Sequence, residues 1–272
     1  MNEGAALLDG ASLWGIAAAL GAMFLLASEL GFAAHRRFGG GGSKNEASDE
    51  TQVLATALLL LALLLGFTFS MALARHDTRR AEVIKEANDI GTAWLRAGLV
   101  ETPAGKTLQD RLGTYAATRV AKAEAHDDAD DDRRADEVMR SKGTALRREI
   151  WDLTAAATLP DRSTAQATAL VAAVNAVIDT ATTREAAIDA RVPAEVIILL
   201  IVYACVSAFL IGYVLGAYRS RHRLATGVLF VLLAMTIVLI IDLDRPQNGS
   251  IRVSQKAMLD LVADIGPKAG AR

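Results

Sequence analysis

The sequence predicts an all-α, polytopic membrane protein with four transmembrane helices and a helical aqueous domain between the second and the third. The first observation is four long apolar runs, at residues 13–34, 53–74, 196–217 and 224–241. Each is close to the ~20 residues that a helix needs to cross ~30 Å of hydrocarbon. The runs are apolar on every side, which is typical of helices in lipid. The charged residues lie almost entirely outside them, although the formal net charge of the whole chain is only -2.

Residues 1–75 form the first predicted membrane pair. The flank before the first run carries Glu3 and Asp9 but no basic residue, and the run is longer than a signal-peptide core, so we expect it to be retained as a membrane helix. Arg36 and Arg37 follow, and then the four consecutive glycines of residues 39–42. Because glycine leaves the backbone maximally free, this loop is predicted to be short and flexible.

Residues 76–192 form the predicted aqueous domain. No proline interrupts residues 51–102, so the second membrane helix is expected to continue far beyond the bilayer. Apolar residues at helical spacing predict four amphipathic helices in this domain. Breaks are expected at Pro103, in the acidic stretch 127–132 and at Pro160. Ser163 and Gln166 fit a capping box at the start of the last helix.

Residues 193–242 form the second predicted membrane pair, and residues 243–272 form a C-terminal tail. Pro193 marks a kink or restart where the last helix of the aqueous domain meets the third span. In that span Gly212 and Gly216 have GxxxG spacing, which is a weak dimerisation signal because glycine is common in membrane helices.

Four spans place the amino terminus, the aqueous domain and the C-terminal tail on one side of the membrane and both short loops on the other. Each short loop has three basic residues, whereas the segment before the first run has none. The positive-inside rule therefore favours cytoplasmic short loops and an aqueous domain outside the cytoplasm. We expect a multi-pass protein of the plasma (inner) membrane that contacts the lipid bilayer.

Composition and motifs argue against several classes of function. The sequence has no extended block of Lys and Arg, so we expect no nucleic-acid partner. The one cysteine, Cys205, lies in the third apolar run, so no Cys/His metal spacing can be built. The sequence also shows no Ser/His/Asp grouping and no nucleotide-binding glycine loop. We therefore expect no enzyme activity, no metal site and no cofactor.

The acidic stretch resembles a calcium loop only superficially. Asp128, Asp130 and Asp132 alternate, but an EF-hand loop begun at Asp128 would have Arg133 in place of its glycine and Met139 in place of its bidentate glutamate. A solvated turn is the preferred interpretation.

Glu29 is the only carboxylate well inside an apolar run. At about 100° per residue it shares a stripe with Ala18 and Ala22, so it is expected to face protein or water. Two interpretations remain open. Glu29 is an ion or proton site, or it reaches the headgroup layer and pairs with Arg36 or Arg37.

The second span contains Gly66, Phe67, Thr68, Phe69 and Ser70. Gly66 and Ser70 are four residues apart and form a small-xxx-small surface, which favours close helix packing. Phe67 and Phe69 are about 200° apart around the helix, so at most one of them can line a pore as a hydrophobic constriction.

A group of charged and polar residues is predicted to gather at the membrane face. It comprises Arg79, Arg80, Glu86, Asn88, Asp242, Asp244 and Arg245. The topology places them on one side of the membrane, so Asp242 or Asp244 can pair with Arg79 or Arg80. Such a group is either a salt-bridge network that sets helix register or a charged vestibule that concentrates an ion at a pore mouth.

These residues resemble the bestrophin-like membrane family, whose function is unassigned. The resemblance covers residues 66–70, residues 79–80 with 86–92, and residues 243–246 with Gly249, Ile251, Arg252 and Val253. It implies kinship with bestrophins, which are pentameric anion channels with four membrane helices per subunit, a phenylalanine-lined neck and a cytosolic helical region. Two features depart from bestrophins. The motif at residues 66–70 lacks prolines, and the charge rule places the central segment outside the cytosol.

The resulting hypothesis is a homo-oligomeric ion channel of the bestrophin-like type that passes small ions. A single subunit has too few spans to surround a hydrated pore, so conduction requires assembly. The alternative is a membrane-anchored helical sensor or scaffold with no conduction.

Overall fold

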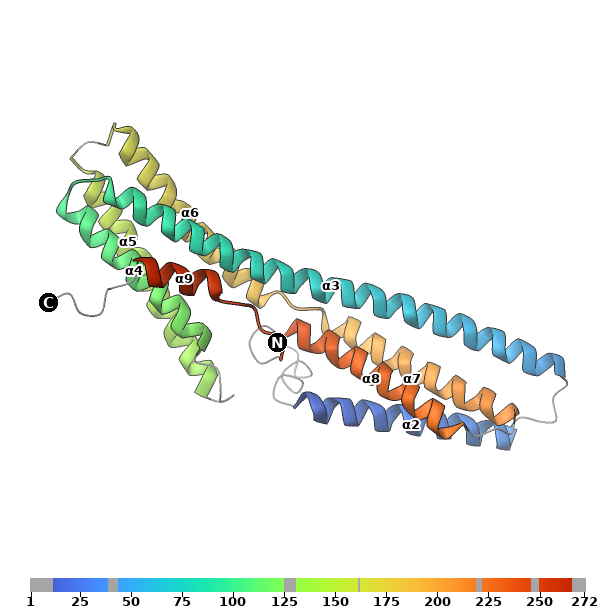
Figure 1. Cartoon of the computed structure of the whole chain (residues 1–272). Helices are drawn as coiled ribbons and strands as arrows, with labels where there is room; N and C mark the ends of the chain where they lie inside the picture. The colour runs from blue at the N-terminus through green and yellow to red at the C-terminus, as the bar shows by residue number, and fades with distance from the viewer. Residues whose placement is uncertain are drawn as a thin grey trace. The chain divides into compact units, whose positions relative to one another are not determined.

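The computed structural model describes residues 12–38, 44–124, 131–160, 162–218, 222–245 and 250–265. Helices are the only regular secondary structure in these ranges, which confirms the all-α prediction (Figure 1). The chain divides into two compact units. The membrane unit comprises residues 1–74, 191–245 and 249–251, and the central unit comprises residues 75–190, 246–248 and 252–272.

The membrane unit contains α2 (Leu13–Phe38), the first part of α3 (Lys44–Gly98), α7 (Ala194–Ala217) and α8 (Arg223–Asp244). Among the described residues, four helices are long and apolar enough to cross a membrane, in the four places that the sequence predicts. The expectation that the second span continues far past the bilayer is also confirmed, because α3 is one helix of 55 residues.

Helices α2 and α7 approach each other through small residues. A Cβ atom added at Gly212 would lie 1.8 Å from the backbone oxygen of Ser28, and one added at Gly31 would lie 2.0 Å from the backbone oxygen of Phe209. A Cβ atom at Gly216 would lie 2.8 Å from the Cβ atom of His35. The GxxxG spacing therefore packs two helices of the same chain, as small residues do where lipid supplies no hydrophobic driving force.

Side chains from all four spans form the core of the membrane unit. Its most buried large members are Phe24, Leu200, Phe230, Ile237 and Ile240. Helix α3 contributes less to this core, chiefly Leu61 and Ala72. Much of the membrane part of α3 consequently remains exposed.

The central unit contains the rest of α3 with α4 (Pro103–Glu124), α5 (Asp131–Thr158), α6 (Ala165–Asp189) and α9 (Lys256–Ile265). Its fully buried core includes Ile90, Leu108, Leu112, Ile150 and Leu170. The predicted breaks before Pro103 and at Pro193 are confirmed, because α4 begins at Pro103 and Pro193 is the N-cap of α7. Residues 127–130 of the acidic stretch lie outside the described residues.

Two features of the central unit differ from the sequence prediction. The N-cap of α6 is Thr164, whose hydroxyl accepts a hydrogen bond from the backbone N–H of Ala167 at 3.1 Å, so the predicted cap at Ser163 is wrong by one residue. The predicted tail contains α9, whose Met258 is fully buried in the core of the central unit.

Candidate functional site

Glu86, a member of the charge group that the sequence predicts at the membrane face, lies in the interior of the central unit. Its side chain is fully buried. The hydroxyl of Tyr115 donates a hydrogen bond to its Oε1 at 3.0 Å, and Arg119 Nη2 donates to its Oε2 at 3.2 Å. Arg184 Nη1 donates to the same Oε2 at 2.5 Å. One carboxylate thus joins α3 to α4 and α6, and we call Glu86, Tyr115, Arg119 and Arg184 the Glu86 cluster.

Further charged and polar side chains extend the Glu86 cluster. Arg147 Nη1 donates to Glu185 Oε1 at 3.1 Å, and Arg119 Nη1 lies 3.8 Å from the same oxygen. Arg184 Nη2 donates to Gln255 Oε1 at 2.9 Å, which ties the segment before α9 to α6. Buried charges are tolerated when they are paired and hydrogen-bonded in this way.

Tyr115 is the phenol of the Glu86 cluster and remains protonated over the physiological range. Burial, followed by the neighbouring carboxylate of Glu86, raises the pKa of Tyr115 from 10.0 to about 12. The protonated hydroxyl can therefore act as the donor to Glu86.

Sequence reasoning missed the partners of Glu86, although the periodicity of α3 contained a signal. Glu86 is three residues after Val83 and four residues before Ile90, so it lies on the apolar face of the helix. Both neighbours are buried. A carboxylate on such a face needs buried donors, and the sequence alone could not show that Arg184 supplies one from 98 residues away.

Arg79 is buried and binds the end of α6. Its Nε donates to the carbonyl oxygen of Ala187 at 3.1 Å, and its Nη2 donates to that of Ala190 at 2.7 Å. A guanidinium at a helix C-terminus satisfies the last carbonyl groups and interacts favourably with the helix dipole.

Asp242 and Asp244 hold backbone segments in the membrane unit. Asp242 is buried and accepts hydrogen bonds from the N–H groups of Ser250 at 2.7 Å and Ile251 at 3.2 Å. Asp244 accepts one from the N–H of Val192 at 2.8 Å. The predicted pairing of these aspartates with Arg79 or Arg80 stays a prediction.

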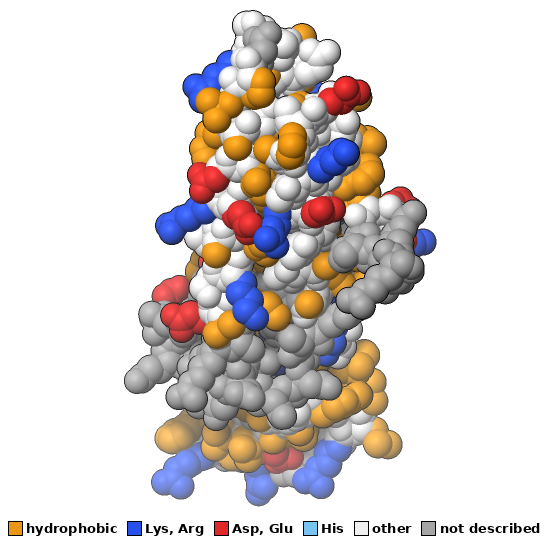
Figure 2. Space-filling view, turned by 90° about the vertical axis from the view of Figure 1, so that its left-hand side faces the viewer, with side chains coloured by type: hydrophobic (Ala, Val, Ile, Leu, Met, Phe, Trp, Pro, Cys, Tyr) orange, Lys and Arg blue, Asp and Glu red, His pale blue; other side chains and the backbone are white. Residues whose placement is uncertain are grey.

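The other members of the predicted charge group differ in exposure. Arg245, at the end of α8, is buried, whereas Arg80 and Asn88 of α3 are exposed. Figure 2 shows side chains of both charge signs interspersed over the face of the central unit that it presents. The fields of interspersed charges of opposite sign partly cancel.

The motif at residues 66–70 has two different faces. Thr68 is buried, and Phe69 packs against the core of the membrane unit. Phe67 is 65% exposed, and a Cβ atom added at Gly66 would meet no described atom within 4 Å. Gly66 therefore makes no close helix contact among the described residues, and Phe67 is the more exposed phenylalanine of the motif.

Phe67 belongs to a longer exposed stripe on the membrane part of α3. At about 100° per residue, the members fall within roughly an 80° arc of the helix. All are exposed, and we call them the α3 stripe: Asp49, Gln52, Thr56, Leu60, Leu63, Phe67 and Ser70. Its two ends are polar and its middle is apolar.

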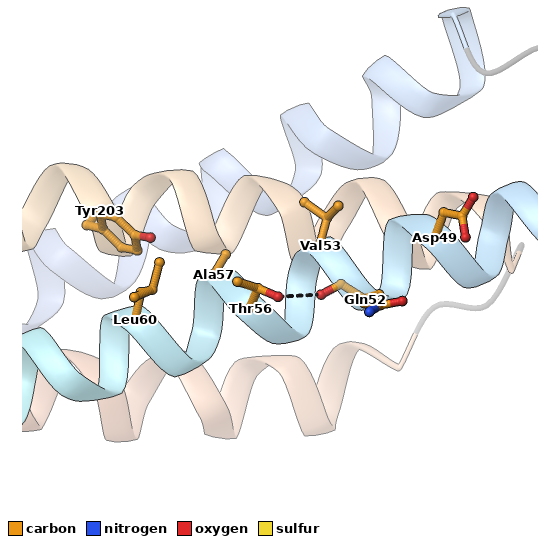
Figure 3. Close-up of a pocket in the computed structure, with 7 residues that line it drawn as sticks. All are labelled: Asp49, Gln52, Val53, Thr56, Ala57, Leu60 and Tyr203. Carbon is orange, nitrogen blue, oxygen red and sulfur yellow. Dashed lines mark hydrogen bonds between the residues drawn. The ribbon is translucent and has the colours of Figure 1, made fainter.

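The first half of the α3 stripe lines a groove against α7. Figure 3 shows Asp49, Gln52, Thr56 and Leu60 on α3 and Tyr203 on α7 around this groove. The volume of the groove is about 530 Å³. The Thr56 hydroxyl donates to the carbonyl oxygen of Gln52 at 3.0 Å, so its donor is satisfied within the helix.

Glu29 lies outside both the packed face of α2 and the α3 stripe. The buried residues of α2 include Phe24, Ser28 and Gly31, whereas the side chain of Glu29 is 56% exposed. Its Oε1 lies 3.8 Å from Nη2 of Arg223 on α8, a partner that the sequence analysis did not name. The stripe that Glu29 shares with Ala18 is thus not the surface through which α2 packs on α7.

The sequence profile of the bestrophin-like domain matches residues 21–258. The chain belongs to the bestrophin-like family. No curated protein and no solved structure matches it. The match includes the α3 stripe, the Glu86 cluster and the close contact of α2 with α7. This bestrophin-like chain, whose described residues include four helices able to cross a membrane, is a multi-pass membrane protein.

Proposed function

We propose that the protein is a subunit of a homo-oligomeric ion channel in the plasma (inner) membrane, and that the α3 stripe lines its pore. The observation that carries this proposal is the order of side chains along the stripe. Asp49, Gln52 and Thr56 form a polar entrance, Leu60, Leu63 and Phe67 an apolar middle, and Ser70 a polar end. A hydrophobic constriction between polar ends is one way in which pores control ion flow.

Membership of the bestrophin-like family supports this function, because the family resemblance implies kinship with oligomeric anion channels. The charge of the α3 stripe, in contrast, favours cations. Asp49 is its charged member, and a ring of carboxylates at a pore mouth favours cations. The channel proposed here passes small ions, with Asp49 as the residue that biases their charge, and performs no enzyme chemistry.

Oligomeric state and conduction are the first measurements. Purified full-length protein is sized in detergent and then placed in planar bilayers in a salt gradient. A ring of subunits that conducts supports the proposal, and Asp49→Asn is expected to shift the reversal potential towards the anion value. A folded oligomer that does not conduct contradicts it and favours a membrane-anchored sensor or scaffold.

Accessibility of single cysteines tests the lining directly. Cys205 is first replaced by serine, and cysteines are then placed at Thr56 or Ser70 on the stripe, with Leu26 as the control. Leu26 is 66% exposed on α2, outside the stripe. A charged thiol reagent should change the current through the two stripe variants but not through the control, because such a reagent reacts in water and not in lipid. Equal effects at all three positions would contradict the proposal that α3 lines the pore.

Phe67→Ala tests the constriction. Removing a ring of phenylalanines from an apolar constriction should widen it and raise the conductance. The matched control is Phe38→Ala, because Phe38 is also exposed but lies at the end of α2. Unchanged conductance in Phe67→Ala would place this side chain away from the narrow part.

A further inference from the structure

A second cavity in the membrane unit has both a carboxylate and a guanidinium at its rim. Its volume is about 290 Å³, which is at the lower end of the range of small-molecule sites. Leu25 and Phe32 of α2 and Leu215 of α7 give it apolar walls. Glu29 and Arg223 line it as well. It is therefore amphipathic.

The position of this cavity matches the headgroup layer of a membrane. Glu29 lies about two turns before the basic end of α2 at His35, Arg36 and Arg37. Arg223 is the first residue of α8. Helix ends with basic residues lie where the hydrocarbon gives way to headgroups.

The two charges at the rim are exposed, and the distance between them is longer than a charge-assisted hydrogen bond. Glu29 Oε1 and Arg223 Nη2 are 3.8 Å apart, and their side chains are 56% and 71% exposed. A charge-assisted hydrogen bond is about 2.7–2.9 Å long. Exposed ion pairs stabilise proteins by little, so separating this pair to admit a ligand costs little.

The start of α8 adds a third feature. His222 is its N-cap, and no side chain among the described residues caps this helix end by a hydrogen bond. The first N–H groups of a helix together with its dipole favour an anion such as phosphate. Arg223 stands at the same place. The cavity rim therefore offers an anion-binding end and, at Glu29, a cation-binding side chain.

We propose that this cavity binds a phospholipid with a phosphoethanolamine headgroup. The phosphate binds Arg223 and the start of α8, the ammonium donates hydrogen bonds to Glu29, and the glycerol region contacts Leu25, Phe32 and Leu215. Glu29 disfavours a headgroup with net negative charge. It also distinguishes ethanolamine from choline, because a quaternary ammonium has no N–H to donate.

Native mass spectrometry of the full-length protein with added lipids tests this site. Phosphatidylethanolamine, phosphatidylcholine and phosphatidylglycerol with identical acyl chains are compared. We expect the ethanolamine lipid to bind about tenfold more tightly than the choline lipid, the size of one charge-assisted hydrogen bond. Glu29→Gln should abolish that preference, and Arg223→Gln should weaken the binding of both lipids.

The controls separate lipid recognition from a folding defect. Glu195→Gln makes the same substitution in the first turn of α7, away from the cavity, and should leave the preference unchanged. Leu25→Trp fills the cavity without changing a charge and should reduce binding of the ethanolamine lipid. The proposal is overturned if folded Glu29→Gln and Leu25→Trp retain the wild-type preference, or if the wild type prefers the glycerol lipid.

Discussion

The helices of the membrane unit and those of the central unit are held together by different kinds of interaction. In the membrane unit, α2 and α7 approach so closely that Gly31 and Gly212 have no room for a Cβ atom. In the central unit, a buried carboxylate and two guanidinium groups join three helices around an apolar core. Each unit thus uses the interaction that suits its surroundings.

The difference agrees with the solvent predicted for each unit. Lipid is as apolar as leucine, so burial of side chains gives little driving force and helices associate through close packing of small residues. In water, which is the surroundings that the sequence predicts for the central unit, apolar side chains are driven into a core, and that burial can compensate the desolvation of a charged cluster. Substitution of small residues should therefore destabilise mainly the membrane unit, and removal of a buried charge should destabilise mainly the central unit.

The largest effect is expected from Glu86→Ala. This change leaves the charges of Arg119 and Arg184 buried without their carboxylate, and it should lower the free energy of unfolding by about 3–5 kcal/mol. The control is Glu149→Ala, which breaks an ion pair with Arg111 whose side chains are 43% and 44% exposed. An exposed pair is worth under about 1 kcal/mol. Chemical denaturation in detergent measures both, and equal losses would contradict a special role for the buried cluster.

Next in size is Gly212→Ala. The added Cβ atom would meet the backbone of Ser28, which cannot move as a side chain can, so we expect a loss of about 2–3 kcal/mol. Gly66→Ala makes the same change in a span where no described atom lies within 4 Å of the new Cβ atom. That variant should be neutral or more stable by up to about 1 kcal/mol. Thermal unfolding in detergent compares them, and a destabilised Gly66→Ala would indicate that α3 packs closely on another subunit.

Tyr115→Phe should have a smaller, pH-dependent effect. It removes one hydrogen bond to Glu86. Oε1 of Glu86 still lies 2.9 Å from Nε of Arg119. The free energy of unfolding should therefore fall by about 1–2 kcal/mol at neutral pH. The pKa of Tyr115 is raised from 10.0 to about 12 in the folded protein. Its stabilisation is therefore fully present below pH 10 and is lost as the pH rises towards 12. Chemical denaturation at several pH values between 10 and 12 measures this effect. The free energy of unfolding should fall less steeply with pH for the variant than for the wild type.

The sequence predicted the helices better than the faces through which they pack. Long apolar runs and the spacing of prolines located the four spans, the 55-residue α3 and the break at Pro193. The packed face of α2 could not be predicted, because this helix has small residues on several sides and hydrophobicity does not distinguish them. In the structure Ser28 and Gly31 are buried on the packed face of α2, and Glu29 is exposed.

The candidate sites were predicted only in part. Phe67 and Ser70 were found from local spacing, but the stripe to which they belong became visible only when the exposure of each α3 residue was known. The Glu86 cluster depends on contacts between residues 29 to 98 positions apart, which local periodicity cannot supply. Sequence patterns therefore singled out some residues of α3 and could not show what these residues contact.

The smallest predicted effect tests the start of α6, where sequence and structure differ by one residue. Thr164→Ala removes the hydroxyl that accepts the N–H of Ala167, and loss of an N-cap costs about 1 kcal/mol. Amide exchange in the first turn of α6 should become about fivefold faster, since opening of this turn is local. Ser163→Ala should leave exchange at Ala167 unchanged. Faster exchange in Ser163→Ala than in Thr164→Ala would restore the capping box that the sequence predicted and would shift the helix start by one residue.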